Sequence, residues 1–329
     1  MIDDLGDAAD GDRTALLTEF GRDLATAWDG GQPDHPAPDH PVPDHPVPDH
    51  PVPDHPVPDH PVPDHPVPDH PAPDHPVLRR LVPTVRARGL DREPFERLIR
   101  ANLLDQHVHR YATYADLRGY CELSAEPIGR IVLAVFAVGD PAAIELSDRI
   151  CTALQLIEHW QDIAEDRRAG RVYLPQEDLT AFGVPETDLD ASVASPALRR
   201  LMAFQITRAA DLLDSGAPLV GLLTGWARLA VAGYLAGGRA ALAALRRPHT
   251  EFLTAPPRPH RRDVLRHLLA ALREAQSPEA QSPEAQSPDP YAPELDSRAV
   301  ATASQQPCCR VREGESRPGC GTPGVSGRD

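Results

Sequence analysis

Three carboxylates recur every four residues in the segment LQLIEHWQDIAEDRRAGRVYLP, residues 154–175: Glu158, Asp162 and Asp166. In a helix this spacing stacks them on one face, and no cation is interleaved before Arg167. Like charges at this spacing disfavour a helix by about 0.2–0.5 kcal/mol per pair. Mg²⁺ compensates such charge well, because it takes one or two protein carboxylates and completes its octahedron with water and phosphate oxygens. A solvated acidic stripe is the alternative interpretation.

The residues that follow this acidic segment favour a diphosphate site. Gly170 predicts the end of the helix. Arg171 and Tyr173 come directly after it, so a guanidinium and a phenol would lie beside the carboxylates and contact a metal-bound diphosphate. Arg171 has an alternative role as the cation that complements the C-terminal end of the helix dipole.

Proline is concentrated in two tracts of the 329-residue chain, which contains 38 prolines. Nine tandem copies of P-D-H-P-V/A fill residues 33–77 and predict an extended, largely polyproline II loop, because proline at this density stops helices and sheet ladders. Metal sequestration by its histidines is an alternative, although histidines five residues apart on a helix of period three point in different directions. Repeats of Q-S-P-E-A predict a disordered tail over 276–329.

The rest of the sequence has apolar residues at helical spacing and no convincing strand pattern, which predicts an all-α bundle. We expect an N-terminal helix in 1–32, the repeat loop in 33–77, a helical core in 78–275 and the tail beyond it. The core helices are expected at Pro94 to Asp105, from Tyr114 with a break at Pro127 and Gly129, from Asp140-Pro141 through the acidic segment, at Glu177 to Phe182, Pro196 to Leu213, Leu219 to Leu245 and His260 to Arg273.

The last of these helices is basic and amphipathic. Its apolar stripe consists of Val264, Leu265, Leu268, Leu269 and Leu272. We expect this stripe to pack on the body of the protein, and a membrane-surface role is the alternative.

Charge and cysteine usage exclude some classes of function. The net charge is −16, and about −7 remains without the nine repeat aspartates, which argues against nucleic acid as a partner. The five cysteines have no metal-binding spacing and suit a reducing cytoplasm. No stretch of eighteen apolar residues predicts a membrane-spanning helix.

With these pieces placed, the chain resembles the squalene/phytoene synthase family over residues 1–29 and 78–273. The segment QLIEHWQDIAEDRRAGRVYLP resembles the family's second aspartate-rich motif with its trailing G-R-x-Y-L-P, and YCELSAEPIG with the preceding RYATYADL is most similar to the hopanoid-pathway hydroxysqualene synthases. The resemblance implies an all-α isoprenoid-synthase bundle around a central cavity. It also implies Mg²⁺ as cofactor and a prenyl diphosphate, presqualene or farnesyl diphosphate, as substrate.

The resemblance also assigns residue roles. DDLGD resembles the first aspartate-rich motif, so Asp3 and Asp7 would hold Mg²⁺ across the cavity from the second motif. Tyr120 would lie near the carbocation and Tyr234 would line the same cavity, with ordinary core packing as the alternative for both. Gln161 would bind substrate, standing where the family often has Arg.

Two departures from the family accompany these matches. Glu158 stands where Asn is common, and we include it among the metal ligands. The helices that precede the first motif in the family are absent from this sequence. We therefore expect either a longer natural chain or a shortened one.

The resulting hypothesis is Mg²⁺-dependent ionisation of presqualene diphosphate to give hydroxysqualene. Presqualene diphosphate or phytoene synthase activity on two prenyl diphosphates, and an inert helical scaffold, are the alternatives. Because the substrate and product are lipids, we also expect peripheral contact with the inner membrane face, and other hopanoid-pathway enzymes as partners.

Overall fold

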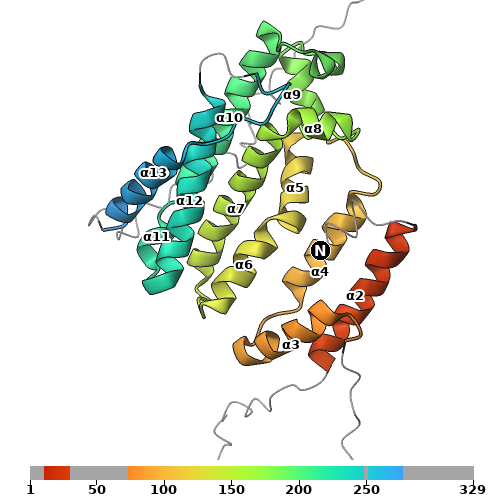
Figure 1. Cartoon of the computed structure of the whole chain (residues 1–329), viewed down its shortest axis with the longest axis vertical. Helices are drawn as coiled ribbons and strands as arrows, with labels where there is room; N and C mark the ends of the chain where they lie inside the picture. The colour runs from red at the N-terminus through yellow and green to blue at the C-terminus, as the bar shows by residue number, and fades with distance from the viewer. Residues whose placement is uncertain (1–10, 30–72, 248–250, 277–329) are drawn as a thin grey trace, which may run out of the picture. The chain divides into compact units, whose positions relative to one another are not determined.

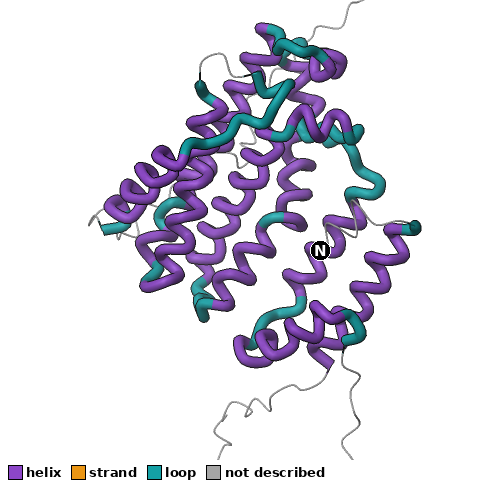
Figure 2. The backbone as a smooth tube through the Cα atoms, viewed as in Figure 1, coloured by secondary structure: helices purple, strands orange, loops and turns teal. Residues whose placement is uncertain are grey.

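The computed structural model describes residues 11–29, 73–247 and 251–276, all within a unit that spans Met1–Ser282. These residues are helical and contain no strand, only an isolated parallel bridge between Arg110 and Val172 (Figures 1 and 2). The elements are α2 (Arg13–Asp29), α3 (Pro76–Arg88), α4 (Glu93–Leu104), α5 (Tyr114–Ser124), α6 (Glu126–Val135), α7 (Pro141–Gln161), α8 (Ile163–Arg168), α9 (Gln176–Ala181), η1 (Glu186–Asp190), α10 (Pro196–Gly216), α11 (Leu219–Leu222), α12 (Gly225–Leu245) and α13 (Arg261–Glu274). The predicted all-α class is confirmed.

The centre of the core is α7, which packs against α6, α10 and α12. Its Leu156 and Trp160 are fully buried, as is Leu201 on α10. Full burial of one such side chain stabilises the fold by about 1.5–3 kcal/mol. A second apolar cluster joins α2, α3 and α4 through Phe20, Leu78, Ile99 and neighbouring side chains. These two clusters hold the helices that carry the predicted site residues.

Local signals in the sequence place several helix ends. The Asp140 side chain accepts a hydrogen bond from the backbone N–H of Ala142 and caps α7, as predicted from Asp140-Pro141. Thr113 and Asp116 form a reciprocal capping box at the start of α5. Gly170 has φ of +82° just beyond α8, so the predicted helix stop is confirmed.

The last P-D-H-P-V copy is part of the folded unit. Asp23 accepts hydrogen bonds from the backbone N–H groups of Asp74 and His75, both at 2.7 Å. The His75 ring nitrogen Nδ1 accepts from the backbone N–H of Val77 and caps α3. The expected boundary after Val77 therefore falls inside a helix, because Pro76 suits the first helical turn. The expectations for the earlier copies and for the tail lie outside the described residues.

Two helices expected to be continuous are interrupted. The acidic segment is divided at Asp162, whose φ of −101° and ψ of 15° end α7 and precede α8, in a stretch where clustered like charges disfavour a continuous helix. The helix expected from Leu219 to Leu245 is divided into two helices, because Leu223 and Thr224 are extended and Gly225 has φ of +55°.

Two smaller expectations are also corrected. The break near Pro127 lies at Ala125, because Pro127 fits in the first turn of α6. The apolar stripe of α13 is only partly packed on the body. Its Leu265 and Leu269 are exposed, because the apolar arc is wider than the contact of this helix with the rest of the unit. Among the helices described, none is long and apolar enough to cross a bilayer.

A close crossing of α7 and α10 gives the first prediction. A Cβ atom added at Gly216 would lie 2.8 Å from the backbone oxygen of Leu146 and 2.6 Å from Ile150 Cγ1. Gly216→Ala should therefore lower the free energy of unfolding by about 1–3 kcal/mol, measured by urea denaturation. Gly237→Ala on α12 is the control, because nothing lies within 4 Å of its Cβ position, and it should be neutral or stabilising. Equal stability of the two variants would contradict this packing.

Candidate functional site

A polar cavity of about 650 Å³ lies between α4, α5, α7 and α8. The predicted residues Glu158, Asp162, Asp166, Arg171 and Tyr120 all line it, together with Tyr173. Its other walls come from α4 and the turn after it, and from α5, α6, α7 and α8, namely Leu98, Ala101, Asn102, Asp105, Ser124, Ile128, Gln155, His159 and Glu165. Side chains separated by more than fifty residues in the sequence thus meet in one cavity.

The three carboxylates of the acidic segment lie in different backbone elements. Glu158 lies in the last turn of α7, Asp162 at the junction and Asp166 in α8. Burial raises the pKa of Asp166 to about 7, opposed by Arg171 and reinforced by repulsion from Asp162 and its acidic neighbours. Burial, followed by repulsion from Glu165, also raises the pKa of Asp162. The cavity therefore favours a cation beside these two carboxylates.

The donor set fits Mg²⁺ in its chemistry. Asp162 and Asp166 supply hard oxygen ligands at a polar cavity, and Mg²⁺ typically takes one or two protein carboxylates and leaves its other positions to water and phosphate. Within the described ranges, no group of three His, Cys, Asp or Glu side chains is placed to hold a metal by itself. Asp3 and Asp7, the predicted ligands from the first motif, lie outside those ranges.

An aromatic wall borders the cavity beside the carboxylates, with His159 Nδ1 3.9 Å from Asp166 Oδ2. Tyr173 stacks on His159 with ring centroids 3.6 Å apart and planes 11° apart. Tyr120 lies 5.8 Å from Tyr173 and 5.5 Å from Tyr111, centroid to centroid. Burial lowers the pKa of His159 to about 3, with Arg171 adding to the effect, so its imidazole is neutral at physiological pH. The wall presents aromatic faces without a cation of its own.

The phenols of this wall are held protonated. Burial raises the pKa of Tyr120 and of Tyr173 far above the ordinary value for tyrosine. The Tyr120 hydroxyl donates to Asp105 Oδ2 at 3.0 Å. Asp105 follows α4, so this hydrogen bond fixes the Tyr120 ring relative to a second helix.

An apolar cavity of about 180 Å³ adjoins the polar one. The two share Ser124, Ile128, Gln155 and Glu158, so the polar cavity lies next to the apolar space between α6, α7 and α12. Tyr234 lines the apolar cavity and not the polar one, and it is partly exposed to solvent. Gln161 lines neither cavity, and its side chain donates to the carbonyl of Pro257 at 2.6 Å.

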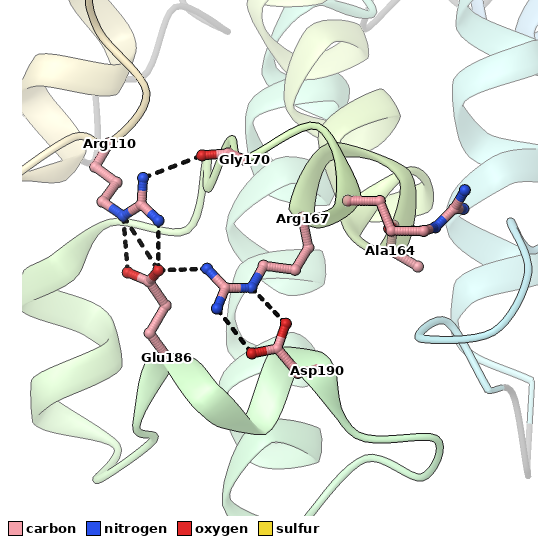
Figure 3. Close-up of polar contacts among 7 residues, drawn as sticks. Arg110, Ala164, Arg167, Gly170, Glu186 and Asp190 are labelled. Atoms are coloured by element: carbon pink, nitrogen blue, oxygen red, sulfur yellow. Dashed lines mark hydrogen bonds and ion pairs between the residues drawn. The ribbon is translucent and has the colours of Figure 1, made fainter.

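An ion-pair network outside the cavity positions the acidic segment, and Figure 3 shows its members. Arg110 donates to Glu186 Oε2 at 2.9 Å and to the carbonyl of Gly170 at 3.1 Å. Arg167 of α8 bonds the same Glu186 and pairs with Asp190 at 2.7 Å. These contacts tie η1 to α8 and to the turn that carries Arg171.

Comparisons with known proteins show the family and the type of fold. The family model described as squalene/phytoene synthase matches residues 1–266. The chain belongs to the squalene/phytoene synthase family. A crystal structure of the squalene synthase HpnC from Alicyclobacillus acidocaldarius is 36% identical with a TM-score of 0.59, covering 74% of this chain and 78% of that one. This likeness confirms the isoprenoid-synthase type of helical fold.

Curated members of the squalene/phytoene synthase family are similar over a shorter region. The hydroxysqualene synthase of Rhodopseudomonas palustris is 37% identical over 123 residues, which are 37% of this chain and 42% of that protein. The 15-cis-phytoene synthase of Synechococcus elongatus is 34% identical over 146 residues, 41% of this chain and 47% of that protein. The chain thus spans less than half the length of these relatives.

The sequence analysis did not identify His159 at the cavity, Tyr111 beside Tyr120 and Tyr173, or Glu186 and Asp190 in the network. The helical spacing could have identified His159, because it lies one turn before Asp162 on the acidic helix. Tyr111 lies within RYATYADL, which was quoted without a role for it. No pattern in the sequence indicated Glu186 or Asp190, because their arginine partners lie 76 and 23 residues away.

The network gives a pH-dependent prediction. Hydrogen bonding from Arg110 lowers the pKa of Glu186 in the folded protein, so its stabilising contribution is present above the ordinary Glu pKa and is lost as pH falls through the lower folded value. Glu186→Gln should therefore reduce stability by about 1 kcal/mol or less at neutral pH, since these pairs are partly exposed. The deficit relative to the unmodified chain should shrink at about pH 3.

Urea unfolding at both pH values measures this deficit. Glu145→Gln on α7 is the control, because Glu145 pairs only with Arg149 one turn away and is more exposed, so its deficit should be smaller at neutral pH. A Glu186→Gln deficit that is unchanged at acid pH would contradict the assigned pairing.

Proposed function

We propose that this chain carries out Mg²⁺-dependent chemistry on prenyl diphosphates in squalene and hopanoid biosynthesis, ionising presqualene diphosphate to give hydroxysqualene. The observation that carries the proposal is that a carboxylate-lined polar cavity adjoins an apolar one, with Gln155 and Glu158 lining both. A prenyl diphosphate has the matching division into an anionic head and an apolar tail. The similarity to HpnC and to a hydroxysqualene synthase supports this choice of reaction.

The acidic side of the cavity would bind the head of the substrate. Asp162 and Asp166 would hold Mg²⁺, together with Asp3 and Asp7, and Glu158 at the boundary is a further candidate ligand. Bound Mg²⁺ supplies neutralisation of the charge that develops on the departing diphosphate. Arg171, whose Nε lies 3.7 Å from Asp166 Oδ1, would turn to the diphosphate oxygens.

The aromatic wall would face the carbon skeleton after ionisation. The C–O bond breaks with its electron pair on the diphosphate, which leaves a carbocation beside Tyr120 and Tyr173. Aromatic faces stabilise such a cation by about 0.5–2 kcal/mol each, and the neutral His159 behind Tyr173 adds no opposing charge. A water oxygen then forms the new C–O bond, and its proton leaves to the released diphosphate or to bulk water.

Three other functions remain as alternatives, and the comparisons favour the first of them. The similarity to 15-cis-phytoene synthases favours condensation of two prenyl diphosphates, to phytoene or presqualene diphosphate. An inert helical scaffold would fold and turn over no prenyl diphosphate. Metal sequestration by the repeat predicts tight Ni²⁺ or Zn²⁺ binding that disappears when residues 33–77 are deleted.

Product analysis separates these functions. The purified full chain with Mg²⁺ and presqualene diphosphate should release diphosphate and a C30 alcohol, measured by mass spectrometry. Turnover of farnesyl or geranylgeranyl diphosphate without turnover of presqualene diphosphate would establish a condensing enzyme instead. Turnover of none of the three by folded protein would establish the scaffold.

The metal role predicts the effect of one isosteric change. Asp166→Asn removes a carboxylate from the cavity and should lower kcat by roughly a hundredfold or more, because metal stabilisation of the leaving group is worth several kcal/mol. Glu145→Gln, at the far end of α7 from Glu158, should leave kcat unchanged. Full activity of Asp166→Asn at saturating Mg²⁺ would exclude a metal role for this residue.

The cation role of Tyr120 is tested by separating its ring from its hydroxyl. Tyr120→Phe keeps the aromatic face and should change kcat by only a few-fold through loss of the Asp105 hydrogen bond. Tyr120→Leu should lower kcat by a further factor of about 2–30, the equivalent of one cation–π contact. Equal rates for the two variants would assign Tyr120 to packing alone.

A further inference from the structure

We infer that the outer face of α13 docks on an anionic lipid surface, a role that does not depend on the proposed reaction. This helix lies on the outside of the unit against α12 (Figure 1). Ala271 is buried in the core, and Leu268 and Leu272 pack against it. At the edge of this contact, Leu265 and Leu269 expose 58% and 45% of their surface. They lie one helical turn apart, so they form a short apolar ridge.

Arginines surround this ridge. Arg262, Arg266 and Arg273 are exposed, and with the two leucines they follow a spacing of three and four residues along one face. We call these five residues the α13 outer face: Arg262, Leu265, Arg266, Leu269 and Arg273. Long arginine side chains can keep their charge at the level of lipid headgroups while neighbouring leucines enter the acyl boundary.

The acidic residues of α13 are paired with arginines of neighbouring segments. Asp263 pairs with Arg247 at 3.2 Å, and Glu274 pairs with Arg239 at 2.8 Å. These are the only two acids in the helix, which therefore keeps an excess of basic groups, although Asp263 also lies 3.7 Å from Arg266 of the outer face. The local positive charge contrasts with the net charge of −16 for the whole chain, which by itself would repel an anionic surface.

Charge complementarity selects the partner. A second copy placed symmetrically on this face would bring arginines against arginines, since a two-fold interface pairs each patch with itself. A nucleic acid would leave the two leucines without an apolar partner. A bilayer that contains anionic lipid satisfies both groups, because it offers phosphate charge beside apolar acyl chains.

Vesicle flotation of the full chain tests this docking. Vesicles of equal parts phosphatidylcholine and phosphatidylglycerol should carry the protein to the top of the gradient, and pure phosphatidylcholine should carry little. Leu265→Ser with Leu269→Ser, and separately Arg262→Glu with Arg266→Glu, should each weaken binding by roughly tenfold or more. Circular dichroism should show the same helix content in every variant.

Matched changes elsewhere on the surface complete the test. Arg79→Glu with Arg80→Glu on α3 makes the same change in net charge, and Val193→Ser removes another exposed apolar residue, so both variants should bind as the unmodified chain does. Equal loss of binding in the α3 variant would replace the proposal with nonspecific charge attraction. Absence of binding to anionic vesicles, or a dimer that the leucine changes dissociate, would overturn it.

Discussion

Carboxylates that repel one another line one cavity, and contacts of the surrounding residues hold them there. The Asp166 side chain is only 15% exposed, and burial and its acidic neighbours raise its pKa towards neutrality. Arg171 offsets part of this charge. Arg110 and Arg167 instead bond Glu186 and Asp190 outside the cavity, where they fix the backbone and leave the interior acidic. An acidic interior of this kind suits a divalent cation that carries a diphosphate.

The interruption at Asp162 is part of the same arrangement. Because α7 ends there and α8 begins at the next residue, Glu158, Asp162 and Asp166 reach the cavity from three backbone settings. The bridge between Arg110 and Val172 then joins the loop before α5 to the loop after α8. That junction brings Tyr111 and Tyr173 together, 5.8 Å apart between ring centroids. The acidic and aromatic sides of the cavity are thus positioned by one set of contacts.

Much of this site could be predicted from local sequence. The carboxylate spacing, Gly170 and the G-R-x-Y-L-P segment identify residues that line the polar cavity, because their relation is set within a few helical turns. The boundary at Asp140-Pro141 follows from a cap that needs no distant partner. The same logic predicted the all-α class from apolar periodicity.

The remainder depends on contacts between distant segments. The apolar cavity needs side chains of α6, α7 and α12 to converge, which no single window of sequence reveals. Gln161 is positioned by a tertiary contact, its hydrogen bond to Pro257. The capping role of His75 depends on the local geometry of the last repeat copy. The exposure of Leu265 and Leu269 depends on how α13 lies on α12, although their periodicity alone indicates a buried stripe.

The central claim is that Asp162 and Asp166 hold the metal that binds the diphosphate head. Anomalous scattering from crystals grown with Mn²⁺ and a thiodiphosphate analogue of the substrate measures this directly. The account predicts Mn²⁺ in contact with carboxylate oxygens of both residues, with the analogue's tail leading past Gln155 into the apolar cavity. Mn²⁺ bound away from both carboxylates, with the diphosphate outside the polar cavity, would contradict it.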